Sequence, residues 1–157
     1  MDYKIDKKSA LSFYGLSRKF STVDGANFRE IPLFWQSVMT DGSFDTMIKT
    51  ATSPNSLGVC MPMDPVNGVE FDYVIGLFGD APVDGYAFHT VPEAEWAIFD
   101  VKGPVNPNLQ EAWKRIYSEW FPQTGFKHAI LPEFEVYSDD DPDSEDNLTQ
   151  IWIPIER

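Results

Sequence analysis

The sequence predicts a single α+β domain spanning residues 1–157, in which two strand-helix-strand-strand units lie side by side with approximate two-fold symmetry. The predicted elements repeat in the same order in half-units of about 1–80 and 81–157. Trp35 and Trp113 occupy similar places in the two predicted helices. We therefore expect one antiparallel sheet with both helices on one face. Ligand sites often lie where two structural units meet, so we also expect a ligand cleft between the two units.

Two helices are predicted from apolar side chains that recur at helical spacing. The clearer one covers residues 106–120, with Pro107 at its first position and Pro122 expected to end it. The other covers about 28–39 and is expected to stop at residues 41–42, an Asp-Gly pair. Each helix has a large aromatic face that a sheet has to cover.

Strands are predicted from runs of β-branched and aromatic residues bounded by turn residues. They cover residues 10–19, 57–61, 69–78, 95–101, 132–137 and 147–155. A turn at residues 65–68, Pro-Val-Asn-Gly, separates two of them.

Composition narrows the possible partners. Lys and Arg number 12 against 25 Asp and Glu, a formal net charge of -13 that repels phosphate backbones and anionic lipid head groups. We therefore expect no nucleic acid or membrane partner, whereas the same field attracts organic cations. Cys60 is the only cysteine and the N-terminus has no apolar signal segment, so we expect a cytoplasmic protein. Nothing in the sequence decides between a monomer and a dimer.

The segment from Glu133 to Tyr137 carries the candidate site. Because side chains alternate along a strand, Glu133, Glu135 and Tyr137 share one face. We expect Phe134 and Val136 to face the helices and the carboxylates to face the opposite side. A carboxylate among aromatic rings is a sensible receptor for an organic cation, because ring faces attract positive charge and the carboxylate neutralises it. A solvated acidic strand face is the ordinary alternative.

The aromatic content, 15% of the chain, supplies the walls that such a receptor needs. The candidate ligand-binding residues are Glu135, Tyr137, Trp35, Tyr73, Trp96, Trp113, Tyr117 and Trp152. Met39, Met47, Met61 and Met63 add adaptable surface if they line the cleft, although methionine is more often core filler.

Metal and cofactor motifs are absent from the sequence. His89 and His128 are far apart, with no cysteine or carboxylate at a familiar metal spacing. The acidic run 138–146 lacks the glycine and the spacing of an EF-hand loop, so it is interpreted as an exposed hairpin loop. There is no glycine-rich phosphate loop and no recognisable nucleophile motif. We expect no metal, no cofactor and no assigned catalytic residue.

Three segments carry a family resemblance. The string 109–122, LQEAWKRIYSEWFP, is followed by PEFEVY at 132–137 and IWIPI at 151–155. Together with FREIPLFW at 28–35, they resemble the GyrI-like effector-binding family, which includes the ligand-sensing domains of AraC-type and MerR-type multidrug regulators. The resemblance covers nearly the whole chain.

The resemblance implies two strand-helix-strand-strand units around a cleft, with a buried glutamate in the second unit that binds cationic drugs; by motif this is Glu135. Regulators of the family carry a DNA-binding domain before this one, and residues 1–20 are too few for a helix-turn-helix. We therefore expect either a stand-alone binding module or a trimmed chain.

Three functions remain open at this point. The first is binding of small cationic or amphipathic organic molecules without catalysis, which is preferred. The second is hydrolysis of strained electrophiles, as in some members of the family, with Glu135 as base and Tyr137 or Tyr73 as acid. The third is inhibition of a macromolecular partner by the acidic surface.

Overall fold

A computed structural model describes residues 1–51 and 55–157 of the chain. Within these residues, nine strands form one sheet in which every pairing is antiparallel. The strands are β1 (Tyr3–Lys8), β2 (Leu11–Ser21), β3 (Ser56–Cys60), β4 (Glu70–Phe78), β5 (Ala87–Val91), β6 (Ala94–Lys102), β7 (Lys127–His128), β8 (Glu133–Tyr137) and β9 (Leu148–Glu156). Their order is β1-β6-β9-β8-β3-β4-β2-β5, and β7 pairs with β9.

Six central strands of this order show the repeat. Strands β2, β4 and β3 on one side mirror β6, β9 and β8 on the other, and the two halves meet where β3 pairs with β8. Gly58 of β3 lies directly opposite Glu135 of β8 at this junction. The predicted α+β class and the large antiparallel sheet are confirmed.

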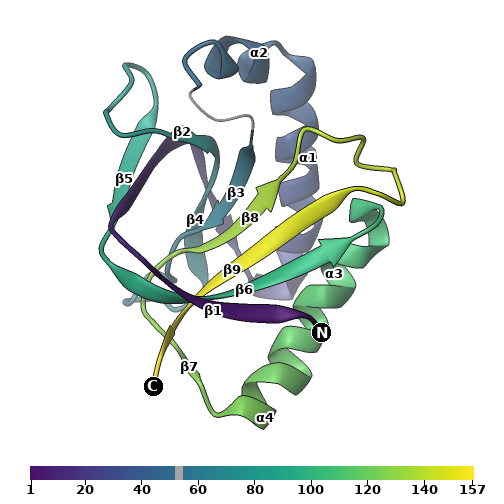
Figure 1. The fold of residues 1–157 in the computed structure, drawn as a ribbon. Coiled ribbons are helices and arrows are strands. Elements are labelled where there is room, and N and C mark those ends of the chain that lie inside the picture. The colour runs from purple at the N-terminus through teal and green to yellow at the C-terminus, as the bar shows by residue number, and fades with distance from the viewer. Residues whose placement is uncertain (52–54) are drawn as a thin grey trace.

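The helices lie on one side of the curved sheet (Figure 1). Over β2 and β4 lie α1 (Ala26–Thr40), α2 (Ser43–Ile48) and the short 3₁₀ turn η1 (Val23–Gly25). Over β6 and β9 lies a second helical segment, formed by α3 (Val105–Arg115), the π-helical turn η2 (Ile116–Trp120) and α4 (Phe121–Thr124). Among the described residues, no helix is both long enough and apolar enough to cross a membrane.

Two short connections explain the curvature of the sheet. Residues 9–10 join β1 at one edge to β2 near the other edge, and residues 92–93 join β5 to β6 in the same way. The sheet therefore curls until its edges approach each other, and its inner face closes on a core of its own. That core contains Phe13, Leu57, Val59, Val74, Val91, Trp96, Ile98, Phe134 and Val136.

This curl corrects the expected orientation of β8. The alternation is as predicted, but Phe134 and Val136 point into the inner core, away from the helices. Glu135 points to the helix-bearing face, where Trp113 of α3 donates a hydrogen bond to it. The sequence pattern shows which residues share a face but not which face the helices cover, because a curled sheet buries both.

The second helical segment runs further than predicted. Pro122 follows the π-helical turn η2 directly, in the first turn of α4, and does not end the segment. Gly125 ends it instead, in the left-handed conformation (φ 74°) that favours glycine. The predicted helix at 28–39 and the six predicted strands match described elements within about two residues, whereas α2, β1, β5 and β7 were not predicted.

Candidate functional site

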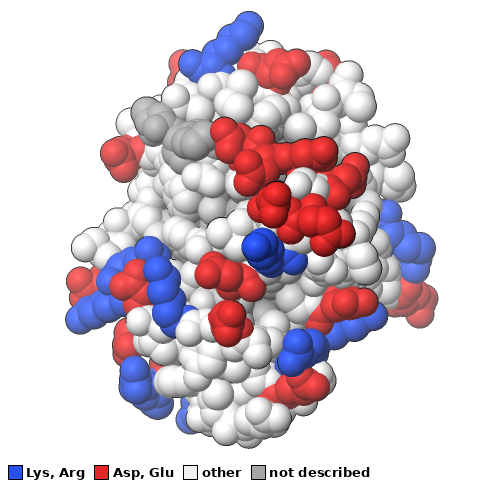
Figure 2. Space-filling model, turned by 45° about the vertical axis from the view of Figure 1, so that its right-hand side comes forward, with Lys and Arg blue, Asp and Glu red and all other residues white. Residues whose placement is uncertain are grey.

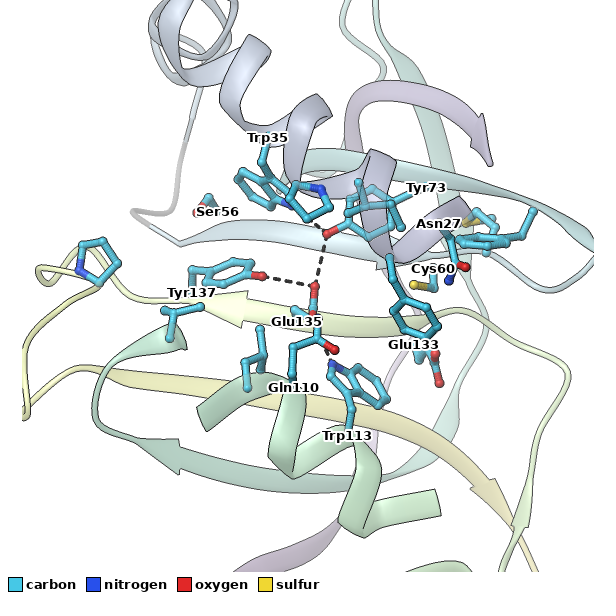
Figure 3. A pocket seen from close by; sticks show the side chains of 18 of the residues that line it. Asn27, Trp35, Ser56, Cys60, Tyr73, Gln110, Trp113, Glu133, Glu135 and Tyr137 are labelled. Carbon is cyan, nitrogen blue, oxygen red and sulfur yellow. Dashed lines mark hydrogen bonds between the residues drawn. The ribbon is translucent and has the colours of Figure 1, made fainter. Parts of the chain in front are cut away.

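A cavity of about 1210 Å³ lies between α1 and α3 on the helix-bearing face of the sheet. Strands β3, β4 and β8 contribute residues to its floor, and the two helices contribute its walls. Figure 3 shows Trp35 reaching in from one helix and Trp113 from the other, with Glu135 between them. The cleft therefore lies at the junction of the two units, where the repeat predicts it.

Glu135 is half-buried at the floor of the cavity and accepts hydrogen bonds on both carboxylate oxygens. The hydroxyls of Tyr73 and Tyr137 each donate to Oε1 at 3.1 Å, and Trp113 Nε1 donates to Oε2 at 2.8 Å. Trp35 Nε1 in turn donates to the Tyr73 hydroxyl at 2.8 Å (Figure 3). Helices and strands from both halves of the chain thus hold one carboxylate in place.

Gly58 leaves room for this arrangement. A Cβ at position 58 would overlap the Tyr73 hydroxyl and lie 2.9 Å from Glu135 Oε1. Only glycine, which has no Cβ, therefore permits the tyrosine and the glutamate to meet above β3. A glycine within the apolar run Leu57-Gly58-Val59 was the available sequence signal for this close approach.

Burial dominates the ionisation of Glu135. Desolvation raises the pKa of its carboxyl, the hydrogen bonds from Trp113, Tyr137 and Tyr73 lower it, and the charge of Glu133 raises it; the net pKa is above the ordinary value. Burial and the neighbouring Glu135 charge raise the pKa of both tyrosine hydroxyls well above the usual range, so these groups stay protonated and donate.

Five of the predicted aromatic residues line the cavity: Trp35, Tyr73, Trp113, Tyr117 and Tyr137. Trp113 and Tyr117 stack with ring centroids 6.1 Å apart, which is the consequence of their four-residue spacing on one helix face. Met39, Met61 and Met63 also line it, whereas Met47 is fully buried in the core beneath α1 and α2.

Trp96 and Trp152 lie elsewhere, which corrects the expectation that they line the cleft. Trp96 is only 1% exposed and belongs to the inner core, and Trp152 packs against the same core. Their rings contact Phe134, and Trp152 also contacts Phe78. Side chains alternate between the two faces of the sheet along β6 and β9, and these two positions fall on the inner face of the curled sheet.

Glu133 and His128 also line the cavity and were not among the candidates. Glu133 accepts hydrogen bonds on Oε2 from the Tyr117 hydroxyl at 2.7 Å and from His128 Nε2 at 3.0 Å. His128 comes from β7, a strand without a sequence signal. No group of three or more His, Cys, Asp or Glu side chains that could hold a metal ion occurs in 1–51 and 55–157.

A family model described as the GyrI-like small molecule binding domain matches residues 1–156. The chain belongs to the GyrI-like family. No curated protein sequence matches the chain. The family membership confirms the resemblance carried by the segments around Trp35, Trp113 and Glu135, and it makes this GyrI-like chain a small-molecule-binding domain.

Solved structures show the same fold. The GyrI-like chain is similar to SAV2435, whose structure was solved bound to tetraphenylphosphonium, with 23% identity and a TM-score of 0.88 over 99% of this chain and 94% of that one. It is also similar to a putative bacterial transcription regulation protein from Staphylococcus aureus MU50, with 23% identity and a TM-score of 0.84 over 100% and 99% of the two chains. A third neighbour is the C-terminal domain of EcmrR, with 18% identity and a TM-score of 0.61 over 99% and 98%.

The indole of Trp113 stabilises the ionised form of Glu135, and this can be tested in the empty protein. Among the described residues, only Trp113 donates a hydrogen bond to Oε2, so Trp113→Phe should raise the pKa of Glu135, because a hydrogen bond to the charged form stabilises it. A ¹³C NMR titration of the carboxyl measures it. Trp35→Phe is the matched control, since Trp35 donates to Tyr73 and should shift this pKa less. Equal changes of the Glu135 pKa in the two variants would contradict a specific role of the Trp113 hydrogen bond.

Proposed function

We propose that this domain binds amphipathic organic cations between α1 and α3, with Glu135 as the counter-ion, and acts as a sensor or sequestering module. One observation carries the proposal. Within the described parts of the chain, Glu135 has three neutral donors and no Lys, Arg or His partner. Desolvation of a carboxylate without a positive partner costs free energy, and a ligand cation in the cavity would reduce that cost.

The walls of the cavity support the same class of ligand. Trp113 of α3 donates to the carboxylate and Trp35 of α1 donates to the neighbouring Tyr73 hydroxyl. Each ring near a cation adds about 0.5–2 kcal/mol when the site is desolvated. Stacking and charge make small geometric demands compared with hydrogen-bond recognition, so we expect several chemically different cations to bind. The similarity in fold to SAV2435, bound to tetraphenylphosphonium, makes that cation the first probe.

The face around the cavity is acidic. Asp139 and Asp140, from the loop between β8 and β9, line one end of the cavity. Figure 2 shows acidic side chains gathered on the side of the molecule where this loop comes forward. Together with the net charge of -13, this field should speed the approach of cations and make the association rate fall as salt is added.

Affinity for tetraphenylphosphonium should depend on pH through Glu135. The raised pKa means that the carboxyl takes up a proton before an exposed glutamate does, and the neutral acid no longer attracts the cation. Affinity should therefore be constant above the pKa of the empty site and fall about tenfold per pH unit below it. Isothermal titration between pH 8 and 4 measures this profile.

Glu135→Gln serves as the control for this titration, because it keeps the shape of the side chain and cannot ionise. Its profile should be flat over the same range. An equally steep profile in the variant would assign the titration to another group. The folding stability of the empty protein should change with pH in the opposite direction. Because the pKa of Glu135 is raised in the folded state, the free energy of unfolding should fall as the pH rises from the ordinary glutamate pKa through this raised pKa.

Hydrolysis is the second candidate, favoured by the two tyrosine hydroxyls that lie 3.1 Å from Oε1 of Glu135. A carboxyl with a raised pKa is a better general base near neutral pH, and a protonated tyrosine is a possible acid. A panel of reactive electrophiles distinguishes the two functions. Product formation that Glu135→Gln abolishes would support hydrolysis, and binding without turnover would support a receptor.

A further inference from the structure

The cavity contains a second carboxylate, Glu133, which the binding of a single charge does not use. Glu133 precedes Glu135 by two residues on β8 and points to the same face, so the two side chains start about 7 Å apart along the strand. Its side chain is 18% exposed. Strand β8 therefore presents two carboxylates to the cavity from alternate positions on one face.

Glu133 retains a free acceptor. Its Oε2 takes the hydrogen bonds from Tyr117 and His128, and Oε1 receives none from any residue that the structure describes. Glu135 differs, because both of its oxygens are already hydrogen-bonded. A donor on a bound ligand could therefore reach Oε1 of Glu133 without displacing a protein group.

His128 is the internal partner of Glu133. Its Nδ1 lies 2.6 Å from the carbonyl oxygen of Ala129, and its Nε2 lies 3.0 Å from Glu133 Oε2. When Glu133 is ionised, both partners are acceptors only, so both ring nitrogens carry hydrogens, as in the charged imidazolium. Burial acts to lower the pKa of His128, but the contacts with Glu133 and Ala129 raise it overall.

Two titratable groups on which the charge of Glu133 acts do not compensate that charge. Tyr117 from η2 and Cys60 from β3 both have a pKa raised by burial and by the Glu133 charge, so both are neutral. The charge of Glu133 also acts on Glu135 and raises its pKa. Glu133 and Glu135 thus act on each other as like charges in a cavity that Lys114, Asp139 and Asp140 also line.

We propose that Glu133 is a second cation subsite, which makes the cavity selective for ligands carrying two positive centres about 7 Å apart, such as short aromatic diamines. This rests on the proposed function, because the first centre binds at Glu135. Such a ligand neutralises both carboxylates and removes their repulsion, whereas a single cation leaves Glu133 shared with His128 alone. The imidazolium of His128 competes with the second positive centre of the ligand for Glu133, and this competition limits the preference for a dication over a monocation.

Two probes of equal length test the proposal. One is N,N′-dibenzyl-1,4-diaminobutane, with two ammonium groups, and the other is N-benzyl-N′-benzoyl-1,4-diaminobutane, in which an amide replaces one of them. The protein should prefer the diamine by about tenfold. In Glu133→Gln the ratio of affinities should fall close to one. Glu119→Gln, which removes an exposed carboxylate outside the cavity, is the charge-matched control and should keep the ratio of the unaltered protein.

His128→Gln gives an independent test if Glu133→Gln does not fold. Removing the imidazolium frees Glu133, so the preference for the diamine should increase. Equal affinities for the two probes in the unaltered protein, or a preference that survives Glu133→Gln, would overturn the second subsite. If tetraphenylphosphonium binds through Glu135 but the ratio is one, only this inference fails. If Glu135→Gln binds every probe as the unaltered protein does, the proposed function fails as well.

Discussion

Replacing Glu135 with glutamine should lower the affinity for tetraphenylphosphonium by about 100-fold at pH 7.5, because truncating one partner of a buried charge pair costs about 2–5 kcal/mol. The substitution keeps the size of the side chain and an acceptor for Trp113, so the walls of the cavity remain in place. Fluorescence or calorimetric titration measures the affinity.

Folding stability separates this loss from simple disruption of the site. The empty protein should be at least as stable with glutamine at position 135, because an unpaired buried charge has been removed. Urea unfolding at pH 7.5 measures this. Glu119→Gln is again the charge-matched control and should leave the affinity unchanged. Equal affinity in Glu135→Gln and the unaltered protein would contradict the role of the carboxylate.

Gly58→Ala should damage both the fold and the site. The added methyl group would overlap the Tyr73 hydroxyl and crowd Glu135 from a strand at the centre of the sheet. Overpacking of this kind costs about 1–3 kcal/mol of folding free energy. Because the tyrosine and the glutamate have to move apart, we also expect about a tenfold loss of cation affinity. Urea unfolding and ligand titration measure the two effects.

A double-mutant cycle identifies the cause. Tyr73→Phe removes the hydroxyl that the new methyl group meets, so Gly58→Ala should cost less stability in the Tyr73→Phe background than in the unaltered protein. Strictly additive losses would mean that the alanine acts through the strand backbone and not through the tyrosine. Cation affinity should stay low in the double variant, because one donor to Glu135 is missing.

The sequence predicts the elements of the helix-bearing face well. Helical spacing on the segment around Trp113 and strand alternation around Glu135 each depend on neighbours within a few residues, and these local patterns survive folding. The shared face of Glu133, Glu135 and Tyr137 follows from the same alternation. The proposed role of Glu135 as a cation receptor therefore follows from local pattern together with the family resemblance.

The curl of the sheet is not available from local pattern. It arises because β1 and β5, two short strands without a clear signal, join opposite edges through connections of two residues. The curl places Trp96 and Trp152 in an inner core. As tryptophans in an aromatic-rich sequence, they were as suitable for the cavity walls as Trp35 and Trp113. His128 enters the site only through β7, whose pairing with β9 is a tertiary contact.

The central claim is that the carboxylate of Glu135 is the counter-ion of the ligand. A ¹³C NMR titration of that carboxyl with and without saturating tetraphenylphosphonium tests it most directly. We expect a pKa above the ordinary glutamate value in the empty protein and a lower pKa in the complex, because a bound cation stabilises the ionised form. Saturation by the ligand with an unchanged pKa would contradict this assignment.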